Sequence, residues 1–149
     1  MFENGSVGAP KFAGLAGWPQ RRRREDRKTE VMEIWINPNC SKCRSALSLL
    51  DAEGAQYTVR YYLQAPPTVQ EIEDVLQRLG LEPWDIARVG EPVAGELGLA
   101  TWPREDSDRI RWIEVLAAHP ILIQRPIITA EDGTAVVGRS ADSVRSVLP

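Results

Sequence analysis

The sequence is poor in the residues from which metal centres and disulfide frameworks are built. It contains two cysteines, Cys40 and Cys43, and one histidine, His119, among its 149 residues. A structural zinc site takes four ligands, which these three residues cannot supply, so we predict no metal site. Two cysteines are also too few for a disulfide scaffold, and a Cys-x-x-Cys pair in a reducing compartment is typical of catalytic or metal-binding sites.

Long apolar runs are also missing. No segment approaches the roughly 20 apolar residues that span a bilayer, and the first thirty residues lack the apolar stretch of a secretory signal. Apolar residues make up 43% of the chain and charged residues 26%, which is ordinary for a globular protein. We therefore expect a cytoplasmic protein with no membrane partner.

Residues 1–31 differ from the remainder of the chain. They carry seven Lys or Arg against four Asp or Glu, whereas the whole chain has a net charge of −3. They show no hydrophobic period and contain several Gly and Pro, so they cannot bury enough surface to offset their ordering entropy. We predict a disordered basic tail, or a segment that is not translated because Met32 begins the first patterned stretch. A basic arm could contact nucleic acid, but we expect no such partner.

The pattern of residues 32–149 predicts one α/β domain. Residues 32–36 and 56–63 are predicted strands, and the helix between them runs from Ser41 to a cap at Gly54. A mostly helical stretch follows, and then a hairpin with its turn at 131–133. The further predicted elements are helices from Thr68 to Leu79, from Asp106 to Ala118 and over 140–148, short helices and loops at 81–105, and strands at 121–129 and 134–138.

Several residues of these elements have expected local roles. Thr68 and Glu71 have the spacing of a capping box, Gly80 suits a helix C-cap, and Ser140 suits an N-cap. The apolar residues of the helix over 106–118 are candidates for the core: Ile110, Ile113, Val115, Leu116 and Ala117.

The segment NPNCSKCR, residues 37–44, places Cys40 where a strand turns into a helix. The unpaired N–H groups of a first helical turn stabilise a thiolate, which lowers the pKa of the thiol and makes it nucleophilic. The same groups can bind an oxyanion. Cys43 lies one turn further on the same face, within reach of a disulfide. The pattern leaves open a single nucleophile, a redox pair or buried thiols.

Three arginines stand out in the second half of the chain: Arg88, Arg125 and Arg139. Guanidinium groups suit tetrahedral oxyanions such as phosphate or arsenate. Arg125 interrupts an apolar strand and precedes Pro126, a peptide bond that can be cis. An arginine in such a place is usually solvated, and the periodicity does not show that the three converge on Cys40.

The motifs NPNCSKCRSALSLL, PPTVQEIEDVLQRLG, RVGEPVAGELGL, HPILIQRPII and VVGRS together resemble the arsenate reductase family of the glutaredoxin-coupled type and its relatives, the Spx transcriptional regulators. The resemblance covers residues 32–149 in order. It implies an α/β, thioredoxin-like fold with a mixed four-stranded sheet and a helical insertion.

The resemblance also implies a chemistry. Cys40 would be the nucleophile that forms a covalent adduct with arsenate, and Arg88, Arg125 and Arg139 would hold the oxyanion. A thiol reductant, glutathione with a glutaredoxin-like protein or an equivalent small thiol, would complete the reduction to arsenite. No tightly bound cofactor is implied, and we expect a monomer.

Two positions depart from the reductase pattern. Ile36 stands where these reductases often carry a histidine, and they usually lack a cysteine at the position of Cys43. The Cys43 position instead resembles the Spx regulators, in which the pair is a redox switch and the protein binds the RNA polymerase α-subunit. Cys43 is therefore a candidate resolving thiol, and a redox-switched regulator and a general thiol-disulfide oxidoreductase remain alternatives.

Overall fold

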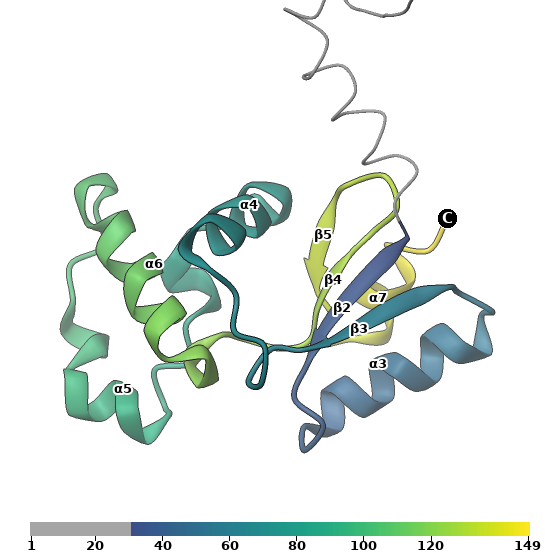
Figure 1. The fold of residues 1–149 in the computed structure, drawn as a ribbon, viewed down its shortest axis with the longest axis horizontal. Helices are drawn as coiled ribbons and strands as arrows, with labels where there is room; N and C mark the ends of the chain where they lie inside the picture. Colours follow the sequence, from purple (N-terminus) through teal and green to yellow (C-terminus); the bar gives the residue numbers. More distant parts are fainter. Residues whose placement is uncertain (1–30) are drawn as a thin grey trace, which may run out of the picture. The chain divides into compact units, whose positions relative to one another are not determined.

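A four-stranded mixed sheet organises residues 31–149, the part of the chain that the computed structural model describes (Figure 1). The strand order is β3-β2-β4-β5. β2 pairs in parallel with β3 and antiparallel with β4, and β4 pairs antiparallel with β5. The strands are β2 (Met32–Ile36), β3 (Tyr57–Tyr61), β4 (Ile127–Thr129) and β5 (Ala135–Val137). The predicted mixed sheet and hairpin are therefore confirmed.

Residues 31–149 also form five α-helices and four short 3₁₀ turns. α3 and α7 pack against each other, whereas α4 contacts both α6 and β5. The helices are α3 (Ser41–Ala52), α4 (Val69–Leu79), α5 (Pro92–Leu97), α6 (Arg109–Ala118) and α7 (Ala141–Arg145), and the 3₁₀ turns cover Pro83–Ile86, Leu99–Thr101, Asp106–Asp108 and Pro120–Leu122.

The predicted basic tail over 1–31 lies, except for Val31, outside the described residues. Within residues 31–149, no helix has both the length and the apolar character that crossing a bilayer requires.

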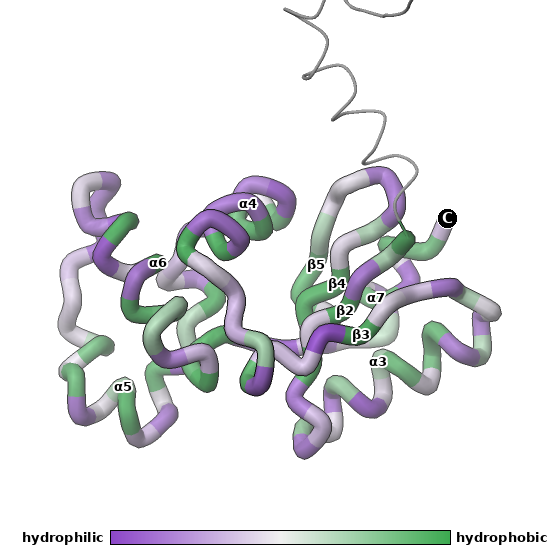
Figure 2. The backbone as a smooth tube through the Cα atoms, in the orientation of Figure 1, coloured by the Kyte–Doolittle hydropathy of each residue, from purple (hydrophilic) through white to green (hydrophobic). Residues whose placement is uncertain are grey.

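The sheet separates two hydrophobic clusters. Met32, Ile34 and Ile36 of β2 pack with residues of α3 and α7, whereas Trp35 packs with the cluster that includes α4 and α6. This division follows from the alternation of side chains along a strand. Figure 2 shows hydrophobic and hydrophilic residues alternating along α3 and α4, as expected for helices that bury one side.

The predicted helix ends are confirmed by their capping contacts. The Thr68 hydroxyl accepts a hydrogen bond from the Glu71 N–H at 3.1 Å, and the Glu71 carboxylate accepts one from the Thr68 N–H at 2.9 Å. Gly80 ends α4 with a φ of 69°, and the Ser140 hydroxyl accepts from the Ser143 N–H at the start of α7. These interactions are local, which is why the sequence pattern predicts them well.

Two predictions for the second half of the chain were wrong. Ile110, expected in the core, is 53% exposed, because it lies in the first turn of α6 on the side turned away from the fully buried Trp112. Of the strand expected over 121–129 with an interruption at 124–126, only the part after the interruption, Ile127–Thr129, forms. Pro120 begins a 3₁₀ turn instead, and Pro126, which follows a cis peptide bond, cannot donate to a strand ladder.

Candidate active site

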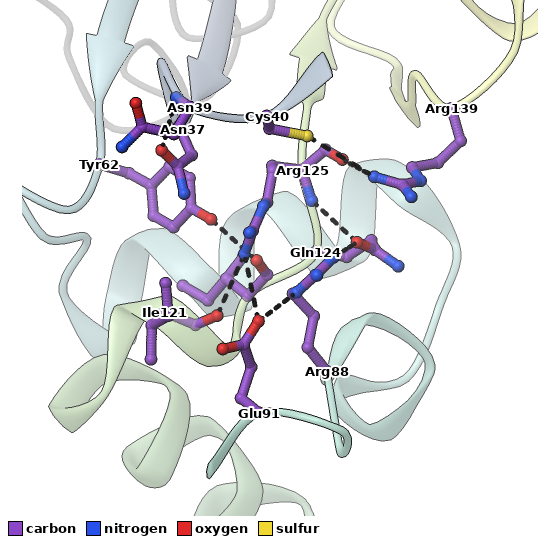
Figure 3. Close-up of polar contacts among 11 residues, drawn as sticks. Asn37, Asn39, Cys40, Tyr62, Arg88, Glu91, Ile121, Gln124, Arg125 and Arg139 are labelled. Atoms are coloured by element: carbon purple, nitrogen blue, oxygen red, sulfur yellow. Dashed lines mark hydrogen bonds and ion pairs between the residues drawn. The ribbon is translucent and has the colours of Figure 1, made fainter. Parts of the chain in front are cut away.

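Cys40 lies at the start of α3, directly after the turn that leaves the central strand (Figure 3). The turn is closed by hydrogen bonds to Asn37: its carbonyl accepts from the Cys40 N–H at 3.0 Å, and its side-chain oxygen accepts from the Asn39 N–H at 3.0 Å. Asn37 is buried, so the turn is fixed to the core. Cys40 itself is partly exposed, which leaves its thiol accessible.

The environment of Cys40 favours the thiolate. Partial burial raises its pKa, but hydrogen bonds from the backbone N–H and the thiol of Cys43, from the Lys42 N–H and from the Arg125 side chain outweigh it and lower the pKa to about 7. A thiol with this pKa is ionised to a large extent at neutral pH and is a competent nucleophile. The shift has the direction that a helix start predicts.

Cys43 has the opposite character. It is fully buried on the inner side of α3. Burial raises its pKa to about 11, and the neighbouring Cys40 adds to the increase. Cys43 is therefore a neutral thiol at pH 7 that donates to Cys40, and the two cysteines are free rather than joined. The predicted Cys-x-x-Cys pair thus consists of one accessible thiolate and one buried thiol.

Arg139 approaches Cys40 from the end of the hairpin. Its guanidinium NH1 lies 3.9 Å from the Cys40 Sγ, and the same NH1 donates to the Arg125 carbonyl at 2.8 Å. Arg139 follows β5 and precedes α7, so the hairpin brings it to a cysteine 99 residues earlier in the chain (Figure 3). The contact with the Arg125 carbonyl fixes the direction of the guanidinium.

Arg125 is buried, with 8% of its surface exposed, so the usual solvated position of an arginine in a strand does not apply. Its NH1 lies 3.3 Å from the Ile121 carbonyl and 3.9 Å from a carboxylate oxygen of Glu91. Its buried Nε–H has no hydrogen-bond partner among residues 31–149. Because an unpaired buried donor is costly, this Nε–H is available to an acceptor that the described residues do not supply.

Arg88 joins this group through two side chains. Its Nε lies 3.0 Å from the Glu91 Oε2, and its NH1 donates to the Gln124 Oε1 at 2.6 Å. Arg88 and Gln124 are brought together by an antiparallel bridge between their neighbours Ala87 and Ile123. The structure therefore brings Arg139 into contact with the Cys40 sulfur and Arg125 close enough to help lower its pKa, and it joins Arg88 to the same cluster through Glu91 and Gln124.

Two members of the cluster, Glu91 and Gln124, are not predicted by the sequence analysis. Each is close in sequence to an arginine, but a polar residue beside an arginine is common on any surface. For metal binding, no group of three His, Cys, Asp or Glu side chains lies together within the described part of the chain.

A groove of about 270 Å³ runs beside the site between α3 and α7. Arg139 lines this groove and also contacts Cys40, whereas Cys40 itself is not one of the lining residues. Its lining is partly cationic, partly hydroxylic and partly apolar, and includes Lys42, Ser45, Leu49, Arg139, Ser140 and Val144.

Comparisons with known proteins agree on one family. The sequence model described as the ArsC family matches residues 35–147. A Streptomyces viridochromogenes protein described as "Uncharacterized protein in glnII region" is 66% identical over 117 residues, which are 78% of this chain and 98% of that protein. An arsenate reductase of Neisseria meningitidis is 40% identical over 118 residues, covering 78% and 97% of the two chains. Among solved structures, an arsenate reductase from Vibrio cholerae superposes with a TM-score of 0.70 at 34% identity, covering 80% of this chain and all of that one.

Proposed function

The chain belongs to the ArsC family, and on this basis we propose that it is a thiol-dependent arsenate reductase with Cys40 as its nucleophile. The observation that carries the proposal is the pairing of an accessible thiol of pKa about 7 with the buried Arg125, whose Nε–H lacks an acceptor among residues 31–149. A tetrahedral oxyanion beside Cys40 would supply that acceptor.

The first chemical step is formation of an adduct. The Cys40 thiolate attacks arsenic, a sulfur–arsenic bond forms, and one arsenate oxygen leaves as water after protonation. Overall, one thiol and one arsenate monoanion give the adduct and one water, with no change in the oxidation state of arsenic. This is nucleophilic catalysis, and its rate depends on the thiolate fraction of Cys40.

The arginines would stabilise the negative charge on the bound anion. Arg125 offers the unpaired Nε–H, and Arg139 lies against the Cys40 sulfur. Arg88 would complete the set from the opposite side of Glu91. Fixed donors of this kind act strongly in a partly dehydrated site, because they do not need to reorient when charge develops.

The second step needs another thiol. That thiol attacks the Cys40 sulfur, a disulfide forms, and the sulfur–arsenic bond breaks with both electrons remaining on arsenic, which leaves as arsenite. Two thiols are thereby oxidised and arsenic is reduced from the +5 to the +3 state. The buried, neutral Cys43 is poorly ionised, so we propose that an external thiol, glutathione with a glutaredoxin-like protein or an equivalent small thiol, attacks first at the partly exposed Cys40.

Arsenate-dependent thiol oxidation tests the proposal. The reduced full chain, supplied with glutathione and glutaredoxin, is expected to turn over arsenate, and Cys40→Ser is expected to lower kcat at least about a thousandfold because the nucleophile is lost. Circular dichroism would show that the variant is folded. Absence of arsenate-dependent turnover with every thiol system tried, or full activity of the variant, would reject the function.

The role of Cys43 can be tested in the same assay. If Cys43 resolves the oxidised Cys40, then Cys43→Ser slows turnover and removes the intramolecular disulfide that mass spectrometry would detect after one turnover. If turnover is unchanged, the external thiol performs both reductive steps.

A further inference from the structure

Glu91 places a negative charge inside the group of arginines that faces Cys40. Its Oε2 lies 3.0 Å from the Arg88 Nε and 3.9 Å from the Arg125 NH1. Figure 3 shows the carboxylate between these two guanidinium groups. The Glu91 side chain is only 20% exposed, so solvent screens this charge incompletely. A carboxylate here repels any anion that approaches the same arginines.

Helix capping does not account for a carboxylate at this position. Glu91 is the N-cap residue of α5, yet within the described structure its side chain makes no capping hydrogen bond. The orientation of Arg88 does not depend on Glu91 alone, because the Gln124 Oε1 accepts from its NH1 at 2.6 Å. The cluster would therefore keep much of its geometry without the negative charge.

We propose that Glu91 is an internal competitor for the anion site and so sets how tightly the site holds free anions. Its carboxylate occupies guanidinium donors that a tetrahedral oxyanion would use, and it thereby lowers the non-covalent affinity for arsenate and for similar anions such as phosphate and sulfate. The inference rests on the proposed function in one respect, namely that arsenate is the anion that reacts with Cys40.

The consequence is a site with a low non-covalent affinity for anions. An anion must first displace Glu91 from the arginines, so its apparent affinity falls with the fraction of sites in which the carboxylate is displaced. This reduction applies equally to arsenate and to phosphate. Once the bond to the Cys40 sulfur forms, arsenate is held covalently, whereas an anion held only by hydrogen bonds and charge leaves the site.

The variant Glu91→Gln tests the competition directly. Glutamine keeps the shape of the side chain, and its amide oxygen can still accept from the Arg88 Nε, but the charge is gone. Calorimetric titration of the reduced full chain with inorganic phosphate, and separately with sulfate, is expected to show an affinity about tenfold higher than that of the wild type, equivalent to ~1.4 kcal/mol of relieved repulsion.

Glu73→Gln is the matched control. Glu73 also pairs with an arginine, with an Oε1 to Arg109 NH1 distance of 3.3 Å, and its side chain is 29% exposed. This variant changes the net charge by the same amount in an ion pair that does not involve the arginines of the site. Phosphate affinity is expected to stay within twofold of the wild type, which separates a local effect of Glu91 from a general effect of charge.

Kinetics supply a second readout. In Glu91→Gln, the KM for arsenate and the inhibition constant for phosphate are both expected to fall by about tenfold, so phosphate inhibits the variant at lower concentrations.

The inference is overturned if Glu91→Gln binds phosphate no more tightly than the wild type, if Glu73→Gln shows the same gain, or if neither wild type nor variant binds either anion. The calorimetric result does not need turnover, so it can fail while arsenate reduction stands, and it can succeed while arsenate reduction fails.

Discussion

The two faces of the sheet contribute to the candidate site in different ways. On the face covered by α3 and α7, Cys40 and Cys43 come from a single helix start, and backbone N–H groups a few residues away lower the pKa of Cys40. On the other face, Arg88 and Gln124 meet across 36 residues of sequence. The thiol is therefore prepared by local structure, whereas the anion-binding group depends on tertiary pairing.

This difference leads to distinct expectations for substitutions. A change that disturbs the helical segment between Thr68 and Ala118 should weaken anion binding while leaving most of the activation of Cys40 intact. A change within α3 should alter the thiol and leave the arginines in place. If the two regions unfold together as one cooperative unit, they differ in function but not in stability.

Among the predicted changes, removing a large core side chain from either region should give the greatest loss in the free energy of unfolding. Trp112 is fully buried in α6 and packs edge-on against Trp84 and Trp102, with ring centroids 6.0 and 5.5 Å away. Trp112→Ala is expected to lower the free energy of unfolding by about 3–5 kcal/mol. Leu50→Ala, at a fully buried position of α3, is expected to cost about 2–5 kcal/mol.

Denaturant unfolding of both variants would show whether the regions are coupled. Tryptophan fluorescence reports mainly on the helical region, and exposure of the Cys43 thiol to a thiol reagent reports on α3. Coincident transitions in each variant would show a single cooperative unit. If Trp112→Ala melted the helical region while Cys43 stayed protected, the two regions would be independent in stability as well.

The next prediction concerns the contact between the two regions at Cys40. Arg125 is one of several donors that lower the pKa of Cys40, after the backbone and side chain of Cys43 and the N–H of Lys42. Arg125→Met should therefore raise this pKa, but not to the ordinary value of a thiol, because the helix donors remain. The thiolate is lost as pH falls, so in the wild type the alkylation rate of Cys40 should fall about fivefold between pH 7 and pH 6.

Peptide mapping after timed alkylation with iodoacetamide would give the rate for Cys40 separately from that for Cys43. The midpoint of the pH profile should move upward in Arg125→Met. Arg88→Met is the control, because Arg88 binds Glu91 and Gln124. An unchanged profile in Arg125→Met would mean that the anion-binding region takes no part in activating the thiol.

The sequence predicts those parts of the molecule that local interactions determine. The capping box of Thr68 and Glu71, the N-cap at Ser140 and the position of Cys40 at a helix start all depend on residues within a few positions of one another. The order of strands and helices follows from hydrophobic periodicity, and the mixed four-stranded sheet follows from the family resemblance.

Tertiary contacts explain what the sequence could not predict. The bridge between Ala87 and Ile123, together with the hydrogen bond from the Arg88 N–H to the Leu122 carbonyl at 2.7 Å, aligns two irregular segments. This pairing carries Glu91 and Gln124 to the arginines, and no periodicity marks either residue. The exposure of Ile110 has a similar origin, since an apolar residue at the start of a helix can face either way.

The smallest predicted effect concerns an ion pair that links β3 to α4 at the border of the two regions. Arg60 of β3 contacts both carboxylate oxygens of Glu71, at 2.7 and 3.0 Å. The hydrogen bonds from Arg60 lower the pKa of Glu71 to about 2. Because 43% of the Glu71 side chain is exposed, Glu71→Gln should lower the free energy of unfolding at pH 7 by no more than about 1 kcal/mol.

The pH dependence of the stability difference between wild type and Glu71→Gln shows whether the charge of Glu71 causes it. The pKa of Glu71 is lower in the folded chain than in the unfolded chain, so the ion pair contributes its full stabilisation above about pH 5 and loses it as pH falls toward 2. Urea unfolding of wild type and Glu71→Gln should therefore give a difference at pH 7 that vanishes near pH 2. Asp74→Asn removes a more exposed carboxylate that binds Arg78 within α4 at 2.8 Å, and it serves as a control for helix charge alone. A difference for Glu71→Gln that persisted at pH 2 would assign the effect to the neutral contacts of the capping box, and the link between the two regions would then not depend on charge.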